Sequence, residues 1–437
     1  MVIGILKDKY MFIIYDIALV IFAIFYLPYF IVKRKYHKDM WMRLGALPKK
    51  TLRALKGQKP IWMHAVSVGE VMAAKPLLDA LHKEFPDKKI VISTVTKTGN
   101  RIARNIASAS DIVIYFPLDL NLIVKRFVAK IDPEIFILLE TEIWPNTIRI
   151  MSARKVPMII VNGRISPRSF KRYKMVRMFL REILKRIDMF CMQSPVDAER
   201  IIELGAPKIK VRTTGNMKFD ASLIKEIFTE REMLIKKAFN LANGQKLIVA
   251  GSTHKGEESA LIKIFKSLKP VFPKLRLLVA PRHIDRTPEI ESLARDSGLK
   301  PARLSQLQIA DMSTNSDLLI LDTLGDLKIA YNLADYVFVG GSLIPGGGHN
   351  MIEPASFAKP IIFGPHTFNF QDIADLFVIK GAAIQVNNEK ELGASLKNIL
   401  HDAEASRALG QRAKRLVEEN SGATARNIGF IKELLNK

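Results

Sequence analysis

The sequence predicts an α/β protein in which an N-terminal membrane-anchor helix precedes two parallel-sheet domains that face each other across a cleft. Three observations lead to this fold class. Short β-branched runs alternate with stretches of helical periodicity, the alternation starts again after the Asn243-Gly244 turn, and Met11–Val32 is almost wholly apolar. With 437 residues, 48% hydrophobic and 25% charged, the chain can bury a core in two or three domains, which excludes a disordered chain and a multi-span membrane protein.

The N-terminal segment is long enough to cross a bilayer, since Met11–Val32 approaches the roughly 20 apolar residues that a spanning helix needs. It offers no small-residue cleavage site, so we expect an uncleaved anchor rather than a signal peptide. Ten basic residues and one acid lie between Lys33 and Lys59, which places the rest of the chain in the cytoplasm by the positive-inside rule. The alternatives are a helix lying in one leaflet, which Asp16 favours, and a buried core helix.

Two further features favour an anionic partner. A helix with one apolar face and basic flanks is predicted between Phe170 and Ile187; it either lies on an anionic lipid surface or packs in the fold with a solvated basic face, and the two are compatible. The net charge of +24 attracts nucleic acid, anionic lipid or phosphorylated substrates, and composition alone does not choose among them.

Candidate strands follow the basic run, separated by stretches long enough for crossover helices. The first series is Ile61–Ser67, Lys89–Thr96, Asp111–Phe116, Ile135–Glu140, Pro157–Asn162, Met189–Gln193 and Lys210–Thr214. The second series is Lys246–Ala250, Leu275–Ala280, Asp317–Leu321, Tyr336–Gly340, Pro360–Phe363 and Ala382–Val386. These series predict two Rossmann-like domains, over residues 39–225 and 226–437, with residues 1–38 as membrane anchor and basic flank. A cleft between the carboxyl ends of two such sheets could hold two different substrates.

Polar residues follow the strands of the first domain. Glu70 comes near the start of a helix, where the dipole favours an ionised carboxylate that can accept a proton from a hydroxyl. Glu140 and Glu142 follow the fourth strand, and Arg164 and Lys218 follow later strands, where a cation could neutralise a departing phosphate. Each of them taken alone could equally be an ordinary first-turn acid or a surface ion pair.

The second domain carries the features of a nucleotide site. The glycines of Gly346–Gly348 let the backbone pass close to a ligand, and His349, Asn350 and Glu353 follow at the start of a helix that can meet phosphate and a ribose diol. Gly251–Glu258 also follows a strand and offers hydroxyls and amides to phosphate, and the next strand ends at Arg282 and His283. A plain glycine-rich turn and structural histidines are the alternatives.

The sequence argues against several cofactors and against a dedicated metal site. The chain has no Walker A spacing and no GxGxxG after a strand, which argues against ATP-driven and nicotinamide chemistry. It has no Asp-x-Asp pair, HExxH or CxxC, so a dedicated metal site is not expected. Cys191 is the single cysteine, which excludes an intrachain disulfide and fits a reducing cytoplasm.

Seven motifs, in this order, resemble those of the Kdo transferases of Gram-negative lipopolysaccharide synthesis. They are SVGE at Ser67–Glu70, ETEIWPN at Glu140–Asn146, NGRIS at Asn162–Ser166, GNMKFD at Gly215–Asp220, GSTHKGEE at Gly251–Glu258, APRH at Ala280–His283 and GGHNMIEPA at Gly347–Ala355. The resemblance covers nearly the whole chain. It implies a GT-B glycosyltransferase that moves 3-deoxy-D-manno-octulosonic acid (Kdo) from CMP-Kdo to a lipid A precursor, with inversion and without metal or cofactor.

Position by position, the resemblance implies that Glu70 is the general base and that Glu140 and Lys218 support the transition state. It implies that CMP binds at Pro281, Arg282, Leu324, Gly325, Asp326, Asn350, Met351, Ile352 and Glu353. Asp326 stands where the family favours Glu, which bears on one CMP contact. The implied partners are CMP-Kdo, a lipid A precursor and the anionic inner membrane, with the catalytic domains on its cytoplasmic side and no nucleic acid bound.

The resulting mechanism is a direct displacement. Glu70 takes a proton from a sugar hydroxyl of the acceptor, the oxygen attacks the anomeric carbon of Kdo, and Arg282, Lys218 and the helix after Gly348 meet the charge of the departing CMP. Three alternatives stay open: an inner-membrane GT-B transferase that uses a UDP-sugar, a membrane-tethered nucleic-acid-binding protein, although no recognition motif is present, and a noncatalytic lipid-binding scaffold.

Overall fold

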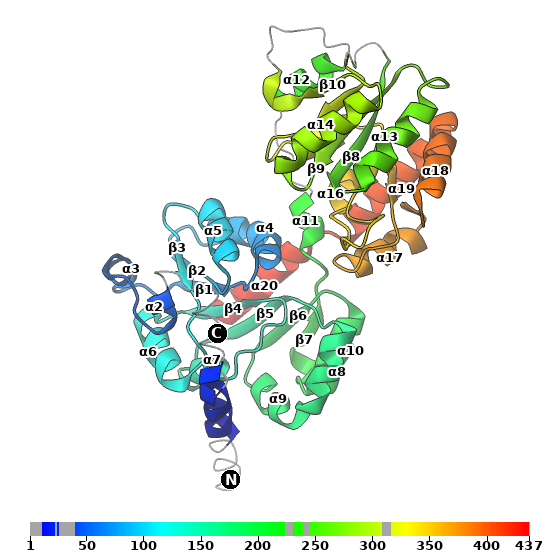
Figure 1. The fold of residues 1–437 in the computed structure, drawn as a ribbon. Coiled ribbons are helices and arrows are strands. Elements are labelled where there is room, and N and C mark those ends of the chain that lie inside the picture. Colours follow the sequence, from blue (N-terminus) through cyan, green and yellow to red (C-terminus); the bar gives the residue numbers. More distant parts are fainter. Residues whose placement is uncertain are drawn as a thin grey trace. The chain divides into compact units, whose positions relative to one another are not determined.

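The chain forms two compact units (Figure 1). The computed structural model describes residues 11–21, 24–25, 40–222, 230–239, 241, 244–307 and 316–436. The first unit comprises Met1–Ala221 and Ser421–Lys437, and the second unit comprises Ser222–Asn420. The predicted range 226–437 differs from this division at its C-terminal end, because the last helix packs on the first unit.

The first unit is built on a seven-stranded sheet in which every neighbouring pair is parallel, in the order β3-β2-β1-β4-β5-β6-β7. The strands are β1 (Ile61–His64), β2 (Ile90–Thr94), β3 (Ile112–Tyr115), β4 (Ile135–Leu139), β5 (Met158–Gly163), β6 (Met189–Met192) and β7 (Val211–Thr213). Alternate residues enter cores on opposite faces, since Trp62 and Phe136 pack on one side while Ile61 and Ile135 pack on the other. Burial of both faces explains why these strands are near-continuous apolar runs.

Helices cover both faces of this sheet. The helical elements of this unit are α2 (Met40–Arg43), α3 (Lys49–Leu55), α4 (Val68–Glu84), α5 (Lys97–Ile106), α6 (Asn121–Ile131), α7 (Pro145–Ala153), α8 (Pro167–Met175), α9 (Arg177–Leu184), α10 (Pro195–Leu204), the 3-10 turn η1 (Lys208–Lys210) and α20 (Ala423–Leu435). The short helix α11 (Lys218–Ser222) lies at the boundary with the second unit. Figure 1 shows α20 in red beside α4. Asp220 fixes the start of α20. The Asp220 carboxylate accepts hydrogen bonds from the backbone N–H groups of Gly422 and Thr424, both at 2.6 Å.

The second unit repeats the architecture, with parallel pairs in the order β10-β11-β9-β8-β12-β13-β14. Its strands are β8 (Lys246–Thr253), β9 (Leu275–Pro281), β10 (Pro301–Arg303), β11 (Leu318–Ile320), β12 (Tyr336–Val339), β13 (Ile361–Phe363) and β14 (Ile384–Gln385). Its helices are α12 (Glu230–Ala238), α13 (Glu257–Leu268), η3 (Ile284–Arg286), α14 (Thr287–Asp296), η4 (Leu304–Gln306), α15 (Leu327–Leu333), α16 (Ile352–Ser356), α17 (Gln371–Ile379), α18 (Glu389–His401) and α19 (Ala403–Asn420). Every predicted strand is present, with ends that differ by up to three residues, whereas β10 was not predicted.

Strand order fixes where a ligand can bind in each unit. The chain adds strands on one side of β1 and then crosses to β4 on the other side, and it does the same at β8 and β12. Loops at the carboxyl ends of the two strands that flank such a switch point diverge and leave a crevice. In the first unit these loops carry Glu70 and Glu140, and in the second they carry His254 and His349.

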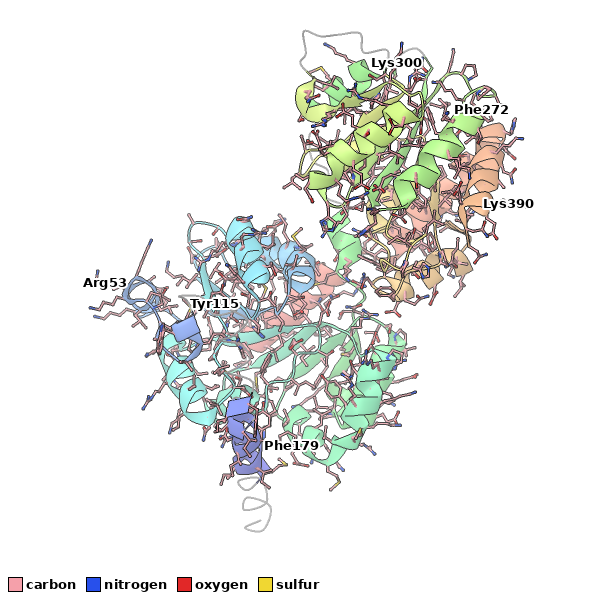
Figure 2. All side chains as sticks on the ribbon, in the orientation of Figure 1. Arg53, Tyr115, Phe179, Phe272, Lys300 and Lys390 are labelled. Atoms are coloured by element: carbon pink, nitrogen blue, oxygen red, sulfur yellow. The ribbon has the colours of Figure 1, made fainter. Side chains whose placement is uncertain are left out.

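The N-terminal segment is helical at residues 11–21 and 24–25 and is docked on the first unit. Figure 2 places Phe179 beside it, and the rings of Phe12 and Tyr15 each lie 5.9 Å from the ring of Phe179. Asp16 Oδ1 accepts a hydrogen bond of 2.7 Å from Asn146 Nδ2. The outward side carries exposed apolar side chains, namely Ile13, Ile14, Ile17, Val20, Ile21, Ile24 and Phe25.

The expected spanning anchor is not confirmed. Among the residues that the structure describes, none of the helices combines the length and the apolar character needed to cross a bilayer. The remainder of the predicted segment Met11–Val32, at 22–23 and 26–32, lies outside the described residues.

The predicted amphipathic helix between Phe170 and Ile187 is two helices, α8 and α9, which meet at Val176. Leu180, Ile183 and Ile187 are buried in the core of the first unit, so most of the apolar face belongs to the fold. Met175 and Met178, however, are 86% and 79% exposed.

Candidate active site

Glu70 lies in the first turn of α4, at the switch point of the first sheet. Its Oε2 accepts a hydrogen bond from the Val66 backbone N–H at 2.7 Å, and its Oε1 accepts one from the Ser67 hydroxyl at 2.8 Å. The residue is 7% exposed, and within the described residues its carboxylate forms no salt bridge.

The pKa of Glu70 is raised above its ordinary value, mainly by burial and further by the charge of Glu140, although the hydrogen bonds from Val66 and Ser67 oppose the rise. Amide hydrogen bonds favour the ionised form of Glu70, as the sequence predicts for this helix start, but burial outweighs them. The consequence is a carboxylate that is a stronger base than an exposed glutamate, which suits proton abstraction from a hydroxyl.

Two further acids follow β4. Glu140 adopts a left-handed backbone with φ of 55°, a conformation that costs a non-glycine residue about 1 kcal/mol or more and often occurs at functional sites. Glu142 is half-buried, and burial raises its pKa to about 7, with the charges of Glu70 and Glu140 adding to the rise. The charge of Glu140 therefore acts on both Glu70 and Glu142, which places the three acids close together.

Hydrogen bonds bring the predicted cationic segments to the same edge. The Thr141 hydroxyl donates to the Arg164 carbonyl at 2.7 Å and accepts from the Arg164 N–H at 3.0 Å. Asn162, left-handed at φ of 55°, accepts a 3.0 Å hydrogen bond from the N–H of Met217, which directly precedes Lys218 at the start of α11. The segments that carry Glu140, Arg164 and Lys218 therefore lie at one edge of the sheet, as expected for residues that follow parallel strands.

A buried carboxylate supports this edge from the side of β3. Asp119, 4% exposed, accepts hydrogen bonds from the backbone N–H groups of Asn146 and Thr147 at 3.0 and 2.9 Å, from the Thr147 hydroxyl at 2.7 Å and from the Tyr15 hydroxyl at 3.1 Å. It caps the start of α7, directly after the Glu140–Trp144 loop. Burial raises the pKa of Asp119 to about 6. Sequence reasoning missed this residue, because no local pattern links it to Asn146.

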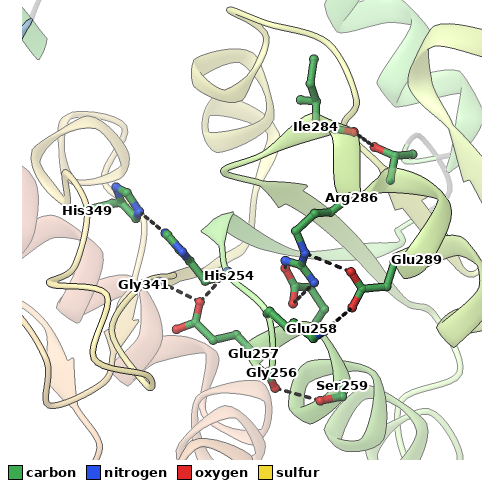
Figure 3. Close-up of polar contacts among 12 residues, drawn as sticks. His254, Gly256, Glu257, Glu258, Ser259, Ile284, Arg286, Glu289, Gly341 and His349 are labelled. Carbon is green, nitrogen blue, oxygen red and sulfur yellow. Dashed lines mark hydrogen bonds and ion pairs between the residues drawn. The ribbon is translucent and has the colours of Figure 1, made fainter. Parts of the chain in front are cut away.

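Three histidines lie near one another at the switch point of the second sheet, and Figure 3 shows two of them, His254 and His349. His254 Nε2 and His349 Nε2 are 2.9 Å apart, so one ring donates and the other accepts, and the ring of His283 lies 5.9 Å from that of His254. The pKa of His349 falls to about 4, mainly through burial and then through the nearby charges of Arg282, His254 and His283. Over the described ranges, no three His, Cys, Asp or Glu side chains are grouped in a way that could hold a metal ion.

The predicted nucleotide contacts fall into two sets. Those after β9 and β11 are accessible except Pro281, which ends β9 and is buried. Arg282 is exposed, Leu324 is 84% exposed, and Asp326, which precedes α15, is half-buried. They lie at the same edge as the histidine cluster, since β11, β9, β8 and β12 are successive neighbours in the sheet. Gly325, between Leu324 and Asp326, has a left-handed φ of 95°.

The second set, Asn350–Glu353, is partly engaged within the protein. Met351 and Ile352 are 1% and 0% exposed, so their side chains face the core and not a ligand. The Ile352 N–H donates to Asn350 Oδ1, and Asn350 Nδ2 donates to Glu353 Oε1, both at 3.1 Å. The Ile352 N–H, one of the backbone amides at the helix start that was predicted to meet phosphate, is therefore already used within the protein.

Comparisons with known proteins agree with these motifs. The family model described as 3-Deoxy-D-manno-octulosonic-acid transferase (kdotransferase) matches residues 38–221. A 3-deoxy-D-manno-octulosonic acid transferase of Haemophilus influenzae is 33% identical over 378 residues, which cover 86% of this chain and 87% of that protein. A bifunctional glycosyltransferase/methyltransferase of Fusobacterium nucleatum is 37% identical over 347 residues, 79% of this chain but only 53% of that longer protein.

Solved structures extend the likeness in fold. The UDP-GlcNAc 2-epimerase from Neisseria meningitidis, bound to UDP-GlcNAc, matches 86% of this chain and 100% of its own with a TM-score of 0.57. At 13% sequence identity, this match concerns the fold alone.

Proposed function

Because this chain belongs to the 3-deoxy-D-manno-octulosonic acid (Kdo) transferase family, we propose that it moves Kdo from CMP-Kdo to a lipid A precursor in lipopolysaccharide synthesis. The observation that carries the proposal is Glu70, a carboxylate with raised pKa at the switch point of the first sheet, grouped with Glu140 and Glu142. We place the acceptor sugar at this edge, and the CMP-sugar at the corresponding edge of the second sheet.

In this proposal the two units work as the halves of a GT-B enzyme, one binding the acceptor and the other the donor. Glu70 removes the proton from the acceptor hydroxyl, and the oxygen attacks the anomeric carbon of Kdo as the bond to the CMP phosphate breaks. A single displacement of this kind inverts the anomeric centre. The general base supplies about 10²- to 10⁴-fold of the rate.

The departing phosphate gains negative charge, and Arg282 and Lys218 are the cations proposed to meet it. Preorganised charges aimed at the leaving group stabilise the transition state more than the ground state. The exposed position of Arg282 at the end of β9 is compatible with this role. We propose that no metal ion or cofactor takes part.

The test measures the transfer of Kdo to the lipid directly. The protein is incubated with CMP-Kdo and a tetraacylated lipid A precursor, and the lipid product is weighed by mass spectrometry. We expect a gain of one or more Kdo residues that persists in EDTA and does not occur when a UDP-sugar replaces CMP-Kdo. Folded protein that binds CMP but leaves the lipid unchanged would disprove the assigned acceptor.

We further propose that the first unit docks on the cytoplasmic face of the inner membrane through the helix at residues 11–21. Phe12 and Tyr15 pack on Phe179, the residue after exposed Met178. We therefore propose that the outward apolar side chains of this helix form one docking surface with Met175 and Met178. Arg172, Lys174 and Arg177 are exposed on the same two helices, α8 and α9, where they can reach lipid phosphates.

A variant that carries both Ile14→Asp and Met178→Asp is expected to bind anionic phosphatidylglycerol vesicles at least about tenfold more weakly, because each change puts a charge into an apolar contact. Flotation on a density gradient measures this. Ile209→Asp is the matched control, since Ile209 is 80% exposed but lies on η1 of the same unit. Equal flotation of all three proteins would contradict the docking surface.

A further inference from the structure

The α13 helix begins at the switch point of the second sheet with two consecutive acids, Glu257 and Glu258. Both are almost fully buried, each with 1% of its surface exposed. Carboxylates are rarely buried unless they are paired or hydrogen-bonded, so the hydrogen-bond partners of Glu257 and Glu258 indicate their structural roles.

Glu257 is satisfied by backbone alone. Its Oε2 accepts hydrogen bonds from the N–H groups of His254 and Gly341 at 2.9 and 2.7 Å, and its Oε1 accepts from those of Ser342 and Leu343, both at 3.0 Å. Figure 3 shows the contacts with His254 and Gly341. One carboxylate thus joins the loop after β8 to the loop after β12.

These two loops carry the paired histidines. His254 is itself one of the four donors, and the Gly341 carbonyl accepts a 2.7 Å hydrogen bond from Gly348, the residue before His349. The loop passes so close to His349 that a Cβ on Gly341 would lie 2.9 Å from His349 Cδ2. The separation of 2.9 Å between the two Nε2 atoms therefore depends on loops that Glu257 holds.

Glu258 holds the third loop of this edge. It accepts a hydrogen bond from Arg286 Nη1 at 2.8 Å, and Arg286 in turn donates its backbone N–H to the carbonyl of His283 at 3.1 Å. Arg286 lies four residues after Arg282. The loop that presents Arg282 is thus tied to the same helix start.

We propose that Glu257 is a positioning residue for donor binding: by occupying the amides of His254 and Gly341–Leu343, it holds the His254–His349 pair where it meets the phosphate of the CMP-sugar. The inference rests on the proposed function for the identity of the ligand. In this proposal the imidazoles and Arg282 bind the phosphate. The backbone amides of His254 and Gly341–Leu343 do not, because the Glu257 carboxylate already accepts their hydrogen bonds.

Glu257→Gln is the critical substitution. A glutamine keeps the size, but its amide nitrogen would face two backbone N–H donors in place of an acceptor, so the loops must shift. We expect the Kd for CMP, measured by calorimetry, and the KM for CMP-Kdo to rise at least about tenfold, with the KM for the lipid acceptor unchanged. The matched control is Glu389→Gln, since Glu389 is an acid of the same unit with a side chain 41% exposed, and it pairs with Lys263 on α13 and not with the three loops.

A second readout does not need turnover. The ring signals of His254 and His349 in carbon-13 NMR are expected to shift in Glu257→Gln, because the two rings no longer lie within hydrogen-bonding distance of each other. Loss of activity through partial unfolding alone would lower kcat with both KM values unchanged. Glu257→Asp, which keeps the charge but is shorter, is expected to fall between wild type and Glu257→Gln and carries the test if Glu257→Gln does not fold.

The outcomes separate the two proposals. A folded Glu257→Gln protein with CMP affinity within about twofold of wild type and unchanged histidine signals would overturn the positioning role. Wild-type protein that does not bind CMP would overturn the proposed donor, while the histidine signals would still decide whether Glu257 positions the pair.

Discussion

Glu70→Gln is expected to lower kcat for Kdo transfer by about 10²- to 10⁴-fold, the range that a general base contributes. The substitution keeps the shape of the side chain and removes the group that takes the proton. The KM for CMP-Kdo should change by less than about threefold, because the proposed donor site lies in the other unit and a base acts mainly in the transition state. Steady-state kinetics with the mass-spectrometric assay measures both constants.

Asp79→Asn is the matched control, since Asp79 is an exposed acid on the same helix that pairs with Lys75. Its kcat should stay within about twofold of wild type, as for most exposed substitutions. Unchanged turnover in Glu70→Gln would rule out the proposed base, and Glu142, with its pKa raised to about 7, would be the next candidate.

The pH profile supplies a second check on Glu70. Because its pKa is raised above 4.5, the deprotonated base is lost as pH falls through a range above 4.5, and kcat/KM should decline there. The charge of Glu140 contributes to the rise, so neutralising Glu140 should move this decline to lower pH. A decline centred below pH 4.5 in wild type would contradict the buried environment of the base.

The elements of the fold were largely predictable because parallel strands buried on both faces are short apolar runs. β4, Ile-Phe-Ile-Leu-Leu, is such a run and was identified, while β10, Pro-Ala-Arg, has none and was missed. The break at Val176 was also missed, because helical periodicity continues through it. The placement of α20 on the first unit depends on Asp220, about 200 residues earlier in the chain, as its contacts with Gly422 and Thr424 show.

The candidate site, like the fold, was predictable from the sequence only in part. Strand order brings Glu70 and Glu140 to one switch point, and the motifs alone indicated that edge. The raised pKa of Glu70 could not be predicted from the sequence, because it depends on burial in the folded protein. The same holds for the hydrogen bonds that the His254 N–H donates to Glu257 and the Ile352 N–H donates to Asn350. The hydrogen bond from the His254 N–H to Glu257 spans three residues, but the N-cap of α13 is Gly256, so no capping-box motif in the sequence marked the role of Glu257.

Asp16 illustrates why a polar residue in an apolar segment is ambiguous from sequence. It was consistent with a helix lying in one leaflet, yet its Oδ1 accepts hydrogen bonds from Asn146 Nδ2 at 2.7 Å and from the Asn121 N–H at 3.3 Å. The helix at residues 11–21 is therefore attached at the start of α7, next to the loop that carries Glu140. Tyr15 reinforces the attachment by donating to Asp119.

Asp119→Ala is expected to lower the free energy of unfolding of the first unit by about 3 kcal/mol or more, since each buried donor left without an acceptor costs about 1–3 kcal/mol. Asn146 N, Thr147 N, the Thr147 hydroxyl and the Tyr15 hydroxyl would all lose their acceptor. Removing a buried carboxylate recovers some desolvation energy, so the loss should be smaller than the sum of these donors. Urea unfolding of the full chain, followed by tryptophan fluorescence, measures it.

Asp87→Ala, at an exposed turn of the same unit, is the control and should change the unfolding free energy by less than about 0.5 kcal/mol. Asp119→Asn should lie between the two, because its Oδ1 can still accept from Thr147 while its amide nitrogen faces the Asn146 N–H. Because Asp119 holds both Tyr15 and the start of α7, Asp119→Ala should also expose the helix at residues 11–21 to proteases before the unit unfolds. If Asp119→Ala is as stable as Asp87→Ala, Asp119 does not support the edge that carries Glu140.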